Sequence, residues 1–334
     1  MFIMKNQSQK LNINPFNYIL TEIESVVNTT DSQLEIWTDC LIGDSDANKA
    51  YNLSYSIKFR GNLVLEALEY ALKTIVQRHE CLRASFSSDG LYMNVYKDSK
   101  IQISHNNISK LTNDEKEKSI ESIIDGEVNC VFDLVKEPLF KVKLIKVDDL
   151  ENIIVLTHHH IIGDGLSINI IVEELGMLYT SFIENIDPNL QNPERFSDYA
   201  QKVNSLIESS DYKKIEEYWL TTYKESVPVI ELPINFSRPD LRTYNSQRFD
   251  FPIEDNLVNS LKELANSTGS SLTTALLSAF EVFLCKITGQ NDLVVGLPVS
   301  GNWRYDMKHL IGNCANLLPL RTKVNSKISF FSGS

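Results

Sequence analysis

The chain has 334 residues, 43% of them hydrophobic, and a formal net charge of −12. This length and apolar content exceed the needs of one small domain, so two lobes are expected. The acidic balance, without a run of Lys or Arg, argues against nucleic acid as a partner, and no apolar stretch approaches the roughly 18 residues of a membrane span. The five cysteines form no CxxC pair, which is typical of free thiols in a reducing cytoplasm.

Apolar periodicity predicts that strands and helices alternate in the first half of the chain. Residues 1–29 are polar and Asn-rich, and their amphipathic piece at residues 16–27 is interpreted as a linker or a short docking helix. An Asp-Gly pair at residues 89–90 predicts a hairpin turn. The predicted strands are residues 51–59, 85–86, 91–96, 139–147 and 152–157, and the predicted helices are 63–76, 113–128 and 166–183.

The second half begins with a segment, residues 192–225, that predicts one or two helices carrying aromatic side chains. Pro228, Pro233 and Pro239 then break the pattern and mark a boundary between lobes. Beyond them the pattern predicts strands at residues 248–252, 293–297 and 317–324, and helices at 254–267 and 272–288.

Three consecutive histidines at positions 158–160 directly follow a short apolar run that predicts a buried strand. A strand end is a rigid support for a base. Alternation along a strand would send His158 and His160 to one face and His159 to the other. Gly165 permits close backbone approach, and Asp164 is near enough to shape the same turn.

Two other interpretations of the histidines are a metal site and a purely structural cluster. Zinc would need a third or fourth ligand. The remaining histidines are His79, His105 and His309, and none has a spacing that supports a metal site. The expectation is therefore that no metal is bound.

Residues 159–165 match the HHxxxDG motif, and this segment resembles the condensation domains of non-ribosomal peptide synthetases. Further matches follow in the family's order over residues 30–324. They are RHExLRxxF at 78–86, FDLxxxPL at 132–139, a YxDYA-like FSDYA at 196–200, YW at 218–219, LP and RP at 232–233 and 238–239, TGQxDxVVG at 288–296, and an IGxxVN-like IGNCAN at 311–316.

The resemblance implies a mixed, two-layer α/β fold of the chloramphenicol acetyltransferase type, with two lobes in a V shape. The first lobe would span residues 30–190. Residues 191–334 would hold the crossover helices and a second lobe that is cut short, because the family's PFE and RDxSRNPL segments are missing.

The resemblance also implies an acyltransferase activity, amide-bond formation between a donor thioester and an acceptor aminoacyl thioester. Both would be presented on the phosphopantetheine arms of peptidyl carrier proteins within adjacent synthetase modules. No directly bound cofactor is implied. The Glu-Ile-Trp variant at residues 35–37 resembles domains that follow polyketide modules, so the donor carrier could be an acyl carrier protein.

The family's second histidine corresponds to His160, which would hold or deprotonate the acceptor amine. His159 would pack inward, the Gly165 N–H would stabilise the oxyanion, and Asp164 would anchor the turn. Tunnel-lining or structural roles are implied for Arg78, Arg83, Tyr199, Asn316 and Arg304.

Two positions depart from the family pattern. The arginine that braces the motif's aspartate aligns with Asn302, and Arg304 is the nearest candidate to replace it. Lys141 stands where the family often has Arg. Epimerisation or ester formation on the same fold stays open, because related domains share the motif. A non-catalytic module that docks carrier proteins, or an inactive fragment, stays open because of Asn302 and the missing C-terminal segments. The cyclising variant is disfavoured, because its DxxxxD pattern is absent.

Overall fold

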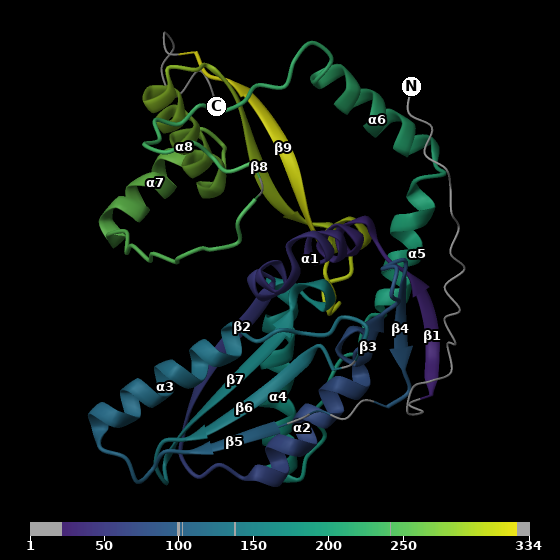
Figure 1. Cartoon of the computed structure of the whole chain (residues 1–334), viewed down its shortest axis with the longest axis vertical. Helices are drawn as coiled ribbons and strands as arrows, with labels where there is room; N and C mark the ends of the chain where they lie inside the picture. Colours follow the sequence, from purple (N-terminus) through teal and green to yellow (C-terminus); the bar gives the residue numbers. More distant parts are fainter. Residues whose placement is uncertain (1–21, 99–100, 102, 137, 241, 326–334) are drawn as a thin grey trace.

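The computed structural model describes residues 22–325 except 99–100, 102, 137 and 241. These residues form two α/β lobes (Figure 1). The first lobe is built on a four-stranded sheet of order β2-β7-β6-β5. Its strands are β2 (Asn52–Arg60), β5 (Ile103–Asn107), β6 (Phe140–Lys146) and β7 (Glu151–His159), and its main helices are α1 (Asp31–Ala50), α2 (Leu65–Arg78), α3 (Asn113–Val128) and α4 (Gly165–Glu184).

Strand β7 lies between β2 and β6, antiparallel to both, and all its residues after Glu151 are buried. Its side chains alternate between two apolar clusters, as a strand requires. Ile154 and Leu156 pack in the large core with α2 and α4, whereas Ile153 and Val155 pack in a smaller cluster with α3. The buried central strand predicted from the apolar run is therefore confirmed.

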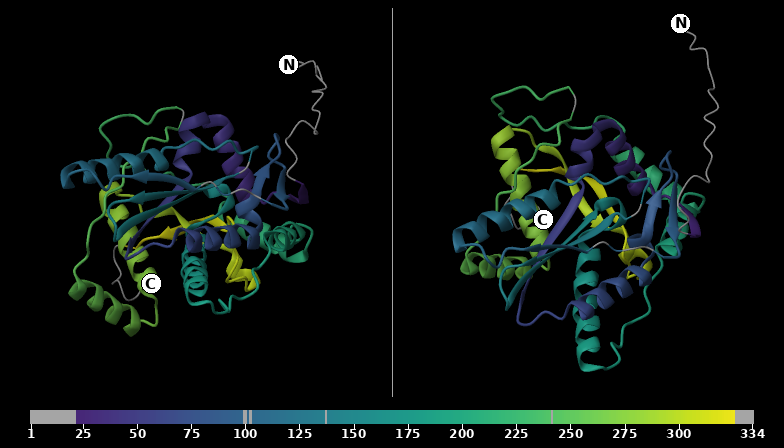
Figure 2. Two further views of the ribbon diagram at one scale, coloured as in Figure 1. Left: turned by 90° about the horizontal axis from the view of Figure 1, so that it is seen from below. Right: turned by 60° about the horizontal axis from the view of Figure 1, so that its bottom comes forward.

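Helices cover both faces of this sheet, with α3 on one side and α2 and α4 on the other (Figure 2). The helix α3 thus adds a third layer to the two that were expected. Thr112 caps α3 and forms a capping box with Glu115, which explains why the helix starts at Asn113. The predicted bounds of this helix are confirmed.

Among the described helices, α4 is long and apolar enough to cross a membrane, with a mean hydropathy of 1.3. The expectation that no apolar stretch approaches the length of a membrane span was therefore wrong, judged by the length and composition of this helix. The helix is partly buried, with 44% of its most apolar window inside the protein, and Ile168, Ile171 and Leu175 pack in the core. The core helices of soluble proteins commonly have this length and hydropathy. Two helices of the second lobe, Asp255–Ser267 and Leu272–Thr288, which meet at a sharp bend, have them when taken together.

A small three-stranded sheet flanks the first lobe, with the order β1-β4-β3. Its strands are β1 (Ile23–Asn28), β3 (Ala84–Phe86) and β4 (Tyr92–Tyr96). The predicted hairpin at residues 89–90 is confirmed, because β3 and β4 pair there. For residues 16–27, interpreted as a linker or a short docking helix, neither alternative holds over residues 23–27, which form β1, and residues 16–21 lie outside the described residues.

Two helices, α5 (Phe196–Leu206) and α6 (Ser210–Thr222), lead away from the first lobe. The described residues between 224 and 254 form neither a helix nor a strand. The strand predicted at residues 248–252 was therefore wrong. Its side chains are exposed, with Phe249 at 69% and Phe251 at 82%, so apolar alternation here does not reflect a buried face.

The second lobe carries a two-stranded antiparallel sheet of β8 (Asp292–Ser300) and β9 (Ala315–Lys323), together with α7 (Asp255–Ser267) and α8 (Leu272–Thr288). All four elements were predicted. The β8–β9 connection, residues 301–314, is called the crossing loop here. It extends back from this sheet to the first lobe (Figure 1).

The crossing loop contributes to the core of the first lobe, where Met307, Leu310, Ile311 and Cys314 are buried. Gly312 lies so close to α5 that an added Cβ would be 2.1 Å from a ring carbon of Phe196. Glycine is required at this point, because any side chain would displace the ring or the loop. The two lobes are thus joined through shared packing as well as through the connecting segment.

Candidate active site

The three histidines lie where β7 ends, at the junction of the two lobes. His158 lies opposite Leu53 and Phe140 in the sheet, and β7 ends at His159. His160 begins a short 3-10 helix, η2 (His160–Ile162). Strand alternation therefore places His158 and His159 on opposite faces but does not extend to His160.

The burial of the histidines differs sharply. His158 is 1% and His159 0% exposed, whereas His160 is half-buried. Burial, followed by the proximity of His160, lowers the pKa of His158 to about 4 and that of His159 to about 3. Both buried rings are thus neutral near pH 7. The more open His160 is the one that a substrate could reach, in line with the burial order expected from the sequence.

His159 packs inward against two side chains and one backbone amide of the first lobe. Its Nδ1 accepts a hydrogen bond from the Ile161 N–H at 3.3 Å, and its Nε2 lies 3.8 Å from the Cys40 sulfur. The Phe132 ring packs edge-on at 6.0 Å. These contacts fix the backbone from which His160 projects.

His160 is held mainly through its backbone. Its N–H donates to the Tyr51 carbonyl at 2.8 Å, and its carbonyl accepts from the Gly163 N–H at 3.3 Å. Of its two ring nitrogens, Nδ1 is buried without a hydrogen-bond partner. The Tyr51 ring meets the imidazole edge-on, with centroids 6.5 Å apart.

Asp164 connects the motif to the crossing loop. One carboxylate oxygen accepts from the Leu166 and Ser167 N–H groups at 3.1 and 3.0 Å, which caps α4. The other oxygen accepts from the Cys314 N–H at 3.2 Å. The side chain of Ser167 also bonds the Gly312 backbone. Asp164 therefore anchors both the turn and the contact between the lobes.

Neither Asn302 nor Arg304 braces Asp164. Asn302 is buried but donates to the Met307 carbonyl at 2.9 Å and accepts from the Ser300 hydroxyl at 2.6 Å, so it shapes the crossing loop instead. Arg304 is exposed on the same loop and forms no ion pair with Asp164 among the described residues. The expectation that Arg304 replaces the brace was wrong, because the Cys314 amide meets the free carboxylate oxygen.

Gly165 is the first residue of α4 and is exposed. An added Cβ would meet nothing within 4 Å, and no hydrogen bond from its N–H occurs within the described part of the chain. The N–H groups of a first helical turn lack intrahelical acceptors. This amide is therefore available as a donor near the histidines.

The charged residues of the motif that contains Arg78 form ion pairs and hydrogen bonds that join separate elements of the first lobe. Arg78 binds Glu174 of α4 through two bonds of 3.1 Å, and His79 donates to the same carboxylate at 3.1 Å. Burial alone would raise the pKa of Glu174, but these hydrogen bonds hold it below its usual value. Arg83 donates to Glu24 of β1 and to a carbonyl of β4. Arg78 and Arg83 thus fasten elements together.

Tyr199 and Asn316 lie beside the crossing loop. Tyr199 is 2% exposed, and an added Cβ on Gly301 would be 2.5 Å from its hydroxyl. Asn316 is exposed at the start of β9 and donates to the Cys314 carbonyl at 3.2 Å. Tyr199 is therefore a core residue that supports the loop, whereas Asn316 is accessible on the second lobe.

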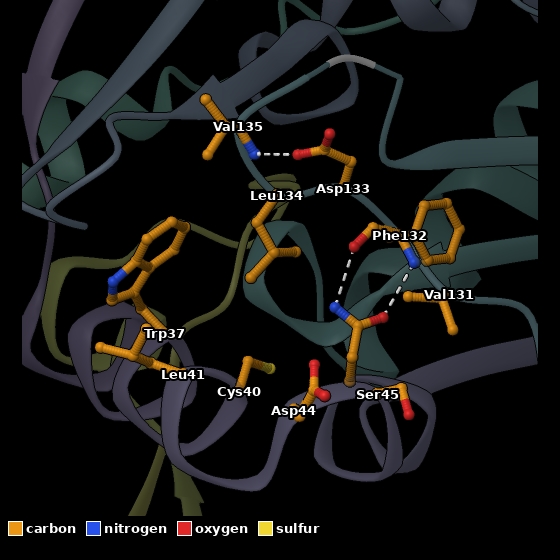
Figure 3. Close-up of a pocket in the computed structure, with 11 residues that line it drawn as sticks. Trp37, Cys40, Leu41, Asp44, Ser45, Val131, Phe132, Asp133, Leu134 and Val135 are labelled. Atoms are coloured by element: carbon orange, nitrogen blue, oxygen red, sulfur yellow. Dashed lines mark hydrogen bonds between the residues drawn. The ribbon is translucent and has the colours of Figure 1, made fainter. Parts of the chain in front are cut away.

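A cavity of about 240 Å³ lies between α1 and residues 131–135 (Figure 3). Trp37, Cys40 and Leu134 are among its lining residues. The amide side chain of Asn48 ties this wall together by bonding both backbone groups of Phe132. Trp37 and Leu134 stand in motif matches found in the sequence, but their proximity was not predicted, because no short motif links α1 to residues 131–135. Among the described residues, no cluster of His, Cys, Asp or Glu is placed to hold a metal.

Two α/β lobes with a histidine motif at the end of a buried strand define the chloramphenicol acetyltransferase-like class of fold. Within that class the chain belongs to the condensation domain family, because the family model "Condensation domain" matches residues 25–333.

Similar curated proteins are peptide synthetases. Bacitracin synthase 3 of Bacillus licheniformis is 34% identical over 275 residues, and surfactin synthase subunit 1 of Bacillus subtilis (strain 168) is 34% identical over 288 residues. The matches cover 81% and 85% of this chain. The chain spans only 4% and 8% of those two proteins.

Solved structures share the fold at low sequence identity. The first condensation domain of the calcium-dependent antibiotic synthetase, in complex with substrate analogue 3a, matches with a TM-score of 0.78 and 19% identity, over 93% of this chain and 72% of that one. The X-domain from teicoplanin biosynthesis matches with a TM-score of 0.79 and 21% identity, over 94% and 69%. At these identities the likeness shows the fold alone.

Proposed function

We propose that this chain catalyses amide-bond formation between a donor acyl or peptidyl thioester and an acceptor aminoacyl thioester. The observation that carries this proposal is the half-buried His160 beside two fully buried, neutral histidines at the junction of the lobes. The substrates would arrive on the phosphopantetheine arms of donor and acceptor carrier proteins, in adjacent synthetase modules. The five free cysteines fit a reducing cytoplasm.

The reaction requires an amine in its free-base form close to an activated carbonyl. The acceptor amine attacks the thioester carbon, the C–N bond forms, and the C–S bond then breaks. His160 would take the proton that the amine loses and pass it to the departing thiolate. Because the thioester is already activated, alignment of the two tethered substrates supplies much of the rate, and no nucleophilic side chain is needed.

The free Gly165 N–H is the candidate donor for the oxyanion that forms on the attacked carbonyl. Asp164 would act indirectly, because its carboxylate is fully engaged by backbone and hydroxyl donors. It caps the start of α4, of which Gly165 is the first residue, and bonds the crossing loop through the Cys314 N–H.

The test uses the natural polypeptide that carries this chain, with donor and acceptor carriers loaded as thioesters. The condensed product is measured by mass spectrometry. We expect the His160→Ala variant to lose about 10²- to 10⁴-fold in rate. The control is His105→Ala, which removes an exposed histidine of β5 and should leave the rate unchanged. A His160→Ala variant as active as the wild type would refute the catalytic role.

A non-catalytic module that docks carrier proteins is the second candidate. It is favoured by Asn302, which stands at the position of the family's bracing arginine and turns away from Asp164. The assay separates the two functions: a docking module would bind loaded carriers, in a pull-down or by calorimetry, and form no product. Ester formation or epimerisation would be recognised from the mass or the chirality of the product.

A further inference from the structure

Tyr51 contacts His160 through both its backbone and its ring. It lies between α1 and β2, and its carbonyl accepts the His160 N–H at 2.8 Å. Its ring stands edge-on to the imidazole, at 89° and with centroids 6.5 Å apart. The same ring lies 6.1 Å from that of His159. A movement of Tyr51 would therefore act directly on His159 and His160.

The Tyr51 hydroxyl is anchored at its far end. It donates to Asp39 Oδ2 of α1 at 2.6 Å, and the same oxygen accepts from Arg242 Nη1 at 3.1 Å. Burial, followed by the Asp39 hydrogen bond and charge, raises the pKa of Tyr51, so the phenol keeps its proton and remains a donor. Arg242 lies between α6 and α7 and its side chain is 69% exposed, so its ion pair contributes little.

His160 has no hydrogen-bonded partner for its imidazole among the described residues, and its buried Nδ1 is unpaired. Catalytic bases are usually oriented by a third group, most often a hydrogen-bonded carboxylate. Here the carboxylate of Asp39 holds Tyr51, and the Tyr51 ring meets the imidazole edge-on.

We propose that Tyr51 is a positioning residue, which orients the His160 imidazole through ring contact and is itself fixed by Asp39. This inference rests on the proposed function of His160. Edge-to-face ring pairs are weak but directional, so removal of the ring should lower kcat about two- to ten-fold and leave KM for the loaded carriers unchanged.

The experiment compares four variants with the wild type in the carrier-based assay. Tyr51→Leu removes the ring contact, Tyr51→Phe keeps the ring but frees it, and Asp39→Asn weakens the anchor. Arg242→Gln should have the smallest effect. The control is Tyr55→Phe on the adjoining strand β2, because the Tyr55 hydroxyl makes no hydrogen bond in the described structure.

A second readout does not depend on turnover. In protein labelled with ¹⁵N-histidine, Tyr51→Leu should shift or broaden the ring resonances of His160, and Tyr55→Phe should not. Thermal unfolding of each variant identifies any general loss of folding.

The outcomes are separable. If the wild type forms no product, the proposed function fails, while unchanged His160 resonances in Tyr51→Leu would refute the positioning role independently. If the wild type is active but folded Tyr51→Leu has the kcat of the control, the positioning role is wrong and the role of His160 stands. A rise in KM alone would show that Tyr51 serves carrier binding and would also overturn the inference.

Discussion

The two carboxylate oxygens of Asp164 have separate tasks, so two substitutions can distinguish them. One oxygen caps α4 and the other accepts the Cys314 N–H from the crossing loop. Asp164→Ala removes both sets of bonds and leaves a buried amide unpaired. A lost cap costs about 0.5–2 kcal/mol, and a lost bond to a charged group about 1.5–3 kcal/mol, so we expect a loss of about 3 kcal/mol in unfolding free energy.

Asp164→Asn replaces one carboxylate oxygen by an NH₂ group. If the remaining oxygen caps α4, the NH₂ group faces the Cys314 N–H; if it accepts from Cys314, the NH₂ group faces the start of α4. The substitution should therefore cost about 1–2 kcal/mol, because only one set of bonds is lost. The control is Thr112→Ala, which removes the exposed cap of α3 and should cost about 1 kcal/mol. Urea denaturation followed by tryptophan fluorescence measures all three. If Asp164→Ala costs no more than Thr112→Ala, the bond between the lobes does not stabilise the fold.

Two further perturbations test the packing of the crossing loop and the buried histidines. Gly312→Ala should lower the melting temperature, because the added Cβ would lie 2.1 Å from a ring carbon of Phe196 in α5. Its control, Gly126→Ala, places a Cβ in open space on α3 and should be neutral or slightly stabilising. Equal melting temperatures of the two variants would contradict the close approach of Gly312 to Phe196. The folded-state pKa values of His158 and His159, about 4 and 3, lie below the unfolded value of about 6.5, so only the unfolded chain gains these protons as pH falls below 6.5. Unfolding free energy should therefore fall by up to about 1.4 kcal/mol per pH unit per histidine between pH 6.5 and 4, and a His158→Gln variant should show a shallower slope than a variant of the exposed His105.

Local patterns in the sequence were sufficient for most of the regular elements. The apolar run before the histidines predicted β7, because a strand buried on both faces needs apolar side chains at successive positions. Helix α3 was predicted to the residue from its helical pattern, with Thr112 or Asn113 expected as the cap, and the structure shows that Thr112 forms a capping box with Glu115. The fold class and the family followed from the order of several short motifs, which the family match over residues 25–333 confirms.

Contacts between distant segments could not be predicted in this way. Asp164 and Cys314 are 150 residues apart, and the bond uses a backbone amide, which leaves no mark in the residue types. Because such backbone contacts are invisible in the residue types, Arg304 was wrongly expected to brace Asp164, and Tyr51 was not recognised as a neighbour of His160. Strand β1 was missed because its residues alternate only weakly between exposed and half-buried positions. Which side chain touches His160 depends on the packing of α1, and no spacing rule gives that.

The crossing loop also affects how the chain is made. Part of the core of the first lobe comes from Met307, Leu310 and Ile311, which a ribosome adds long after the central strand β7. At about 5–20 residues per second, the 150 residues between Asp164 and Cys314 take roughly 8–30 s to synthesise. Throughout that interval the nascent lobe exposes apolar surface that its own sequence cannot yet cover. Synthesis of this chain therefore includes a period in which a chaperone has an apolar surface to bind, and that period ends only when the crossing loop has been made.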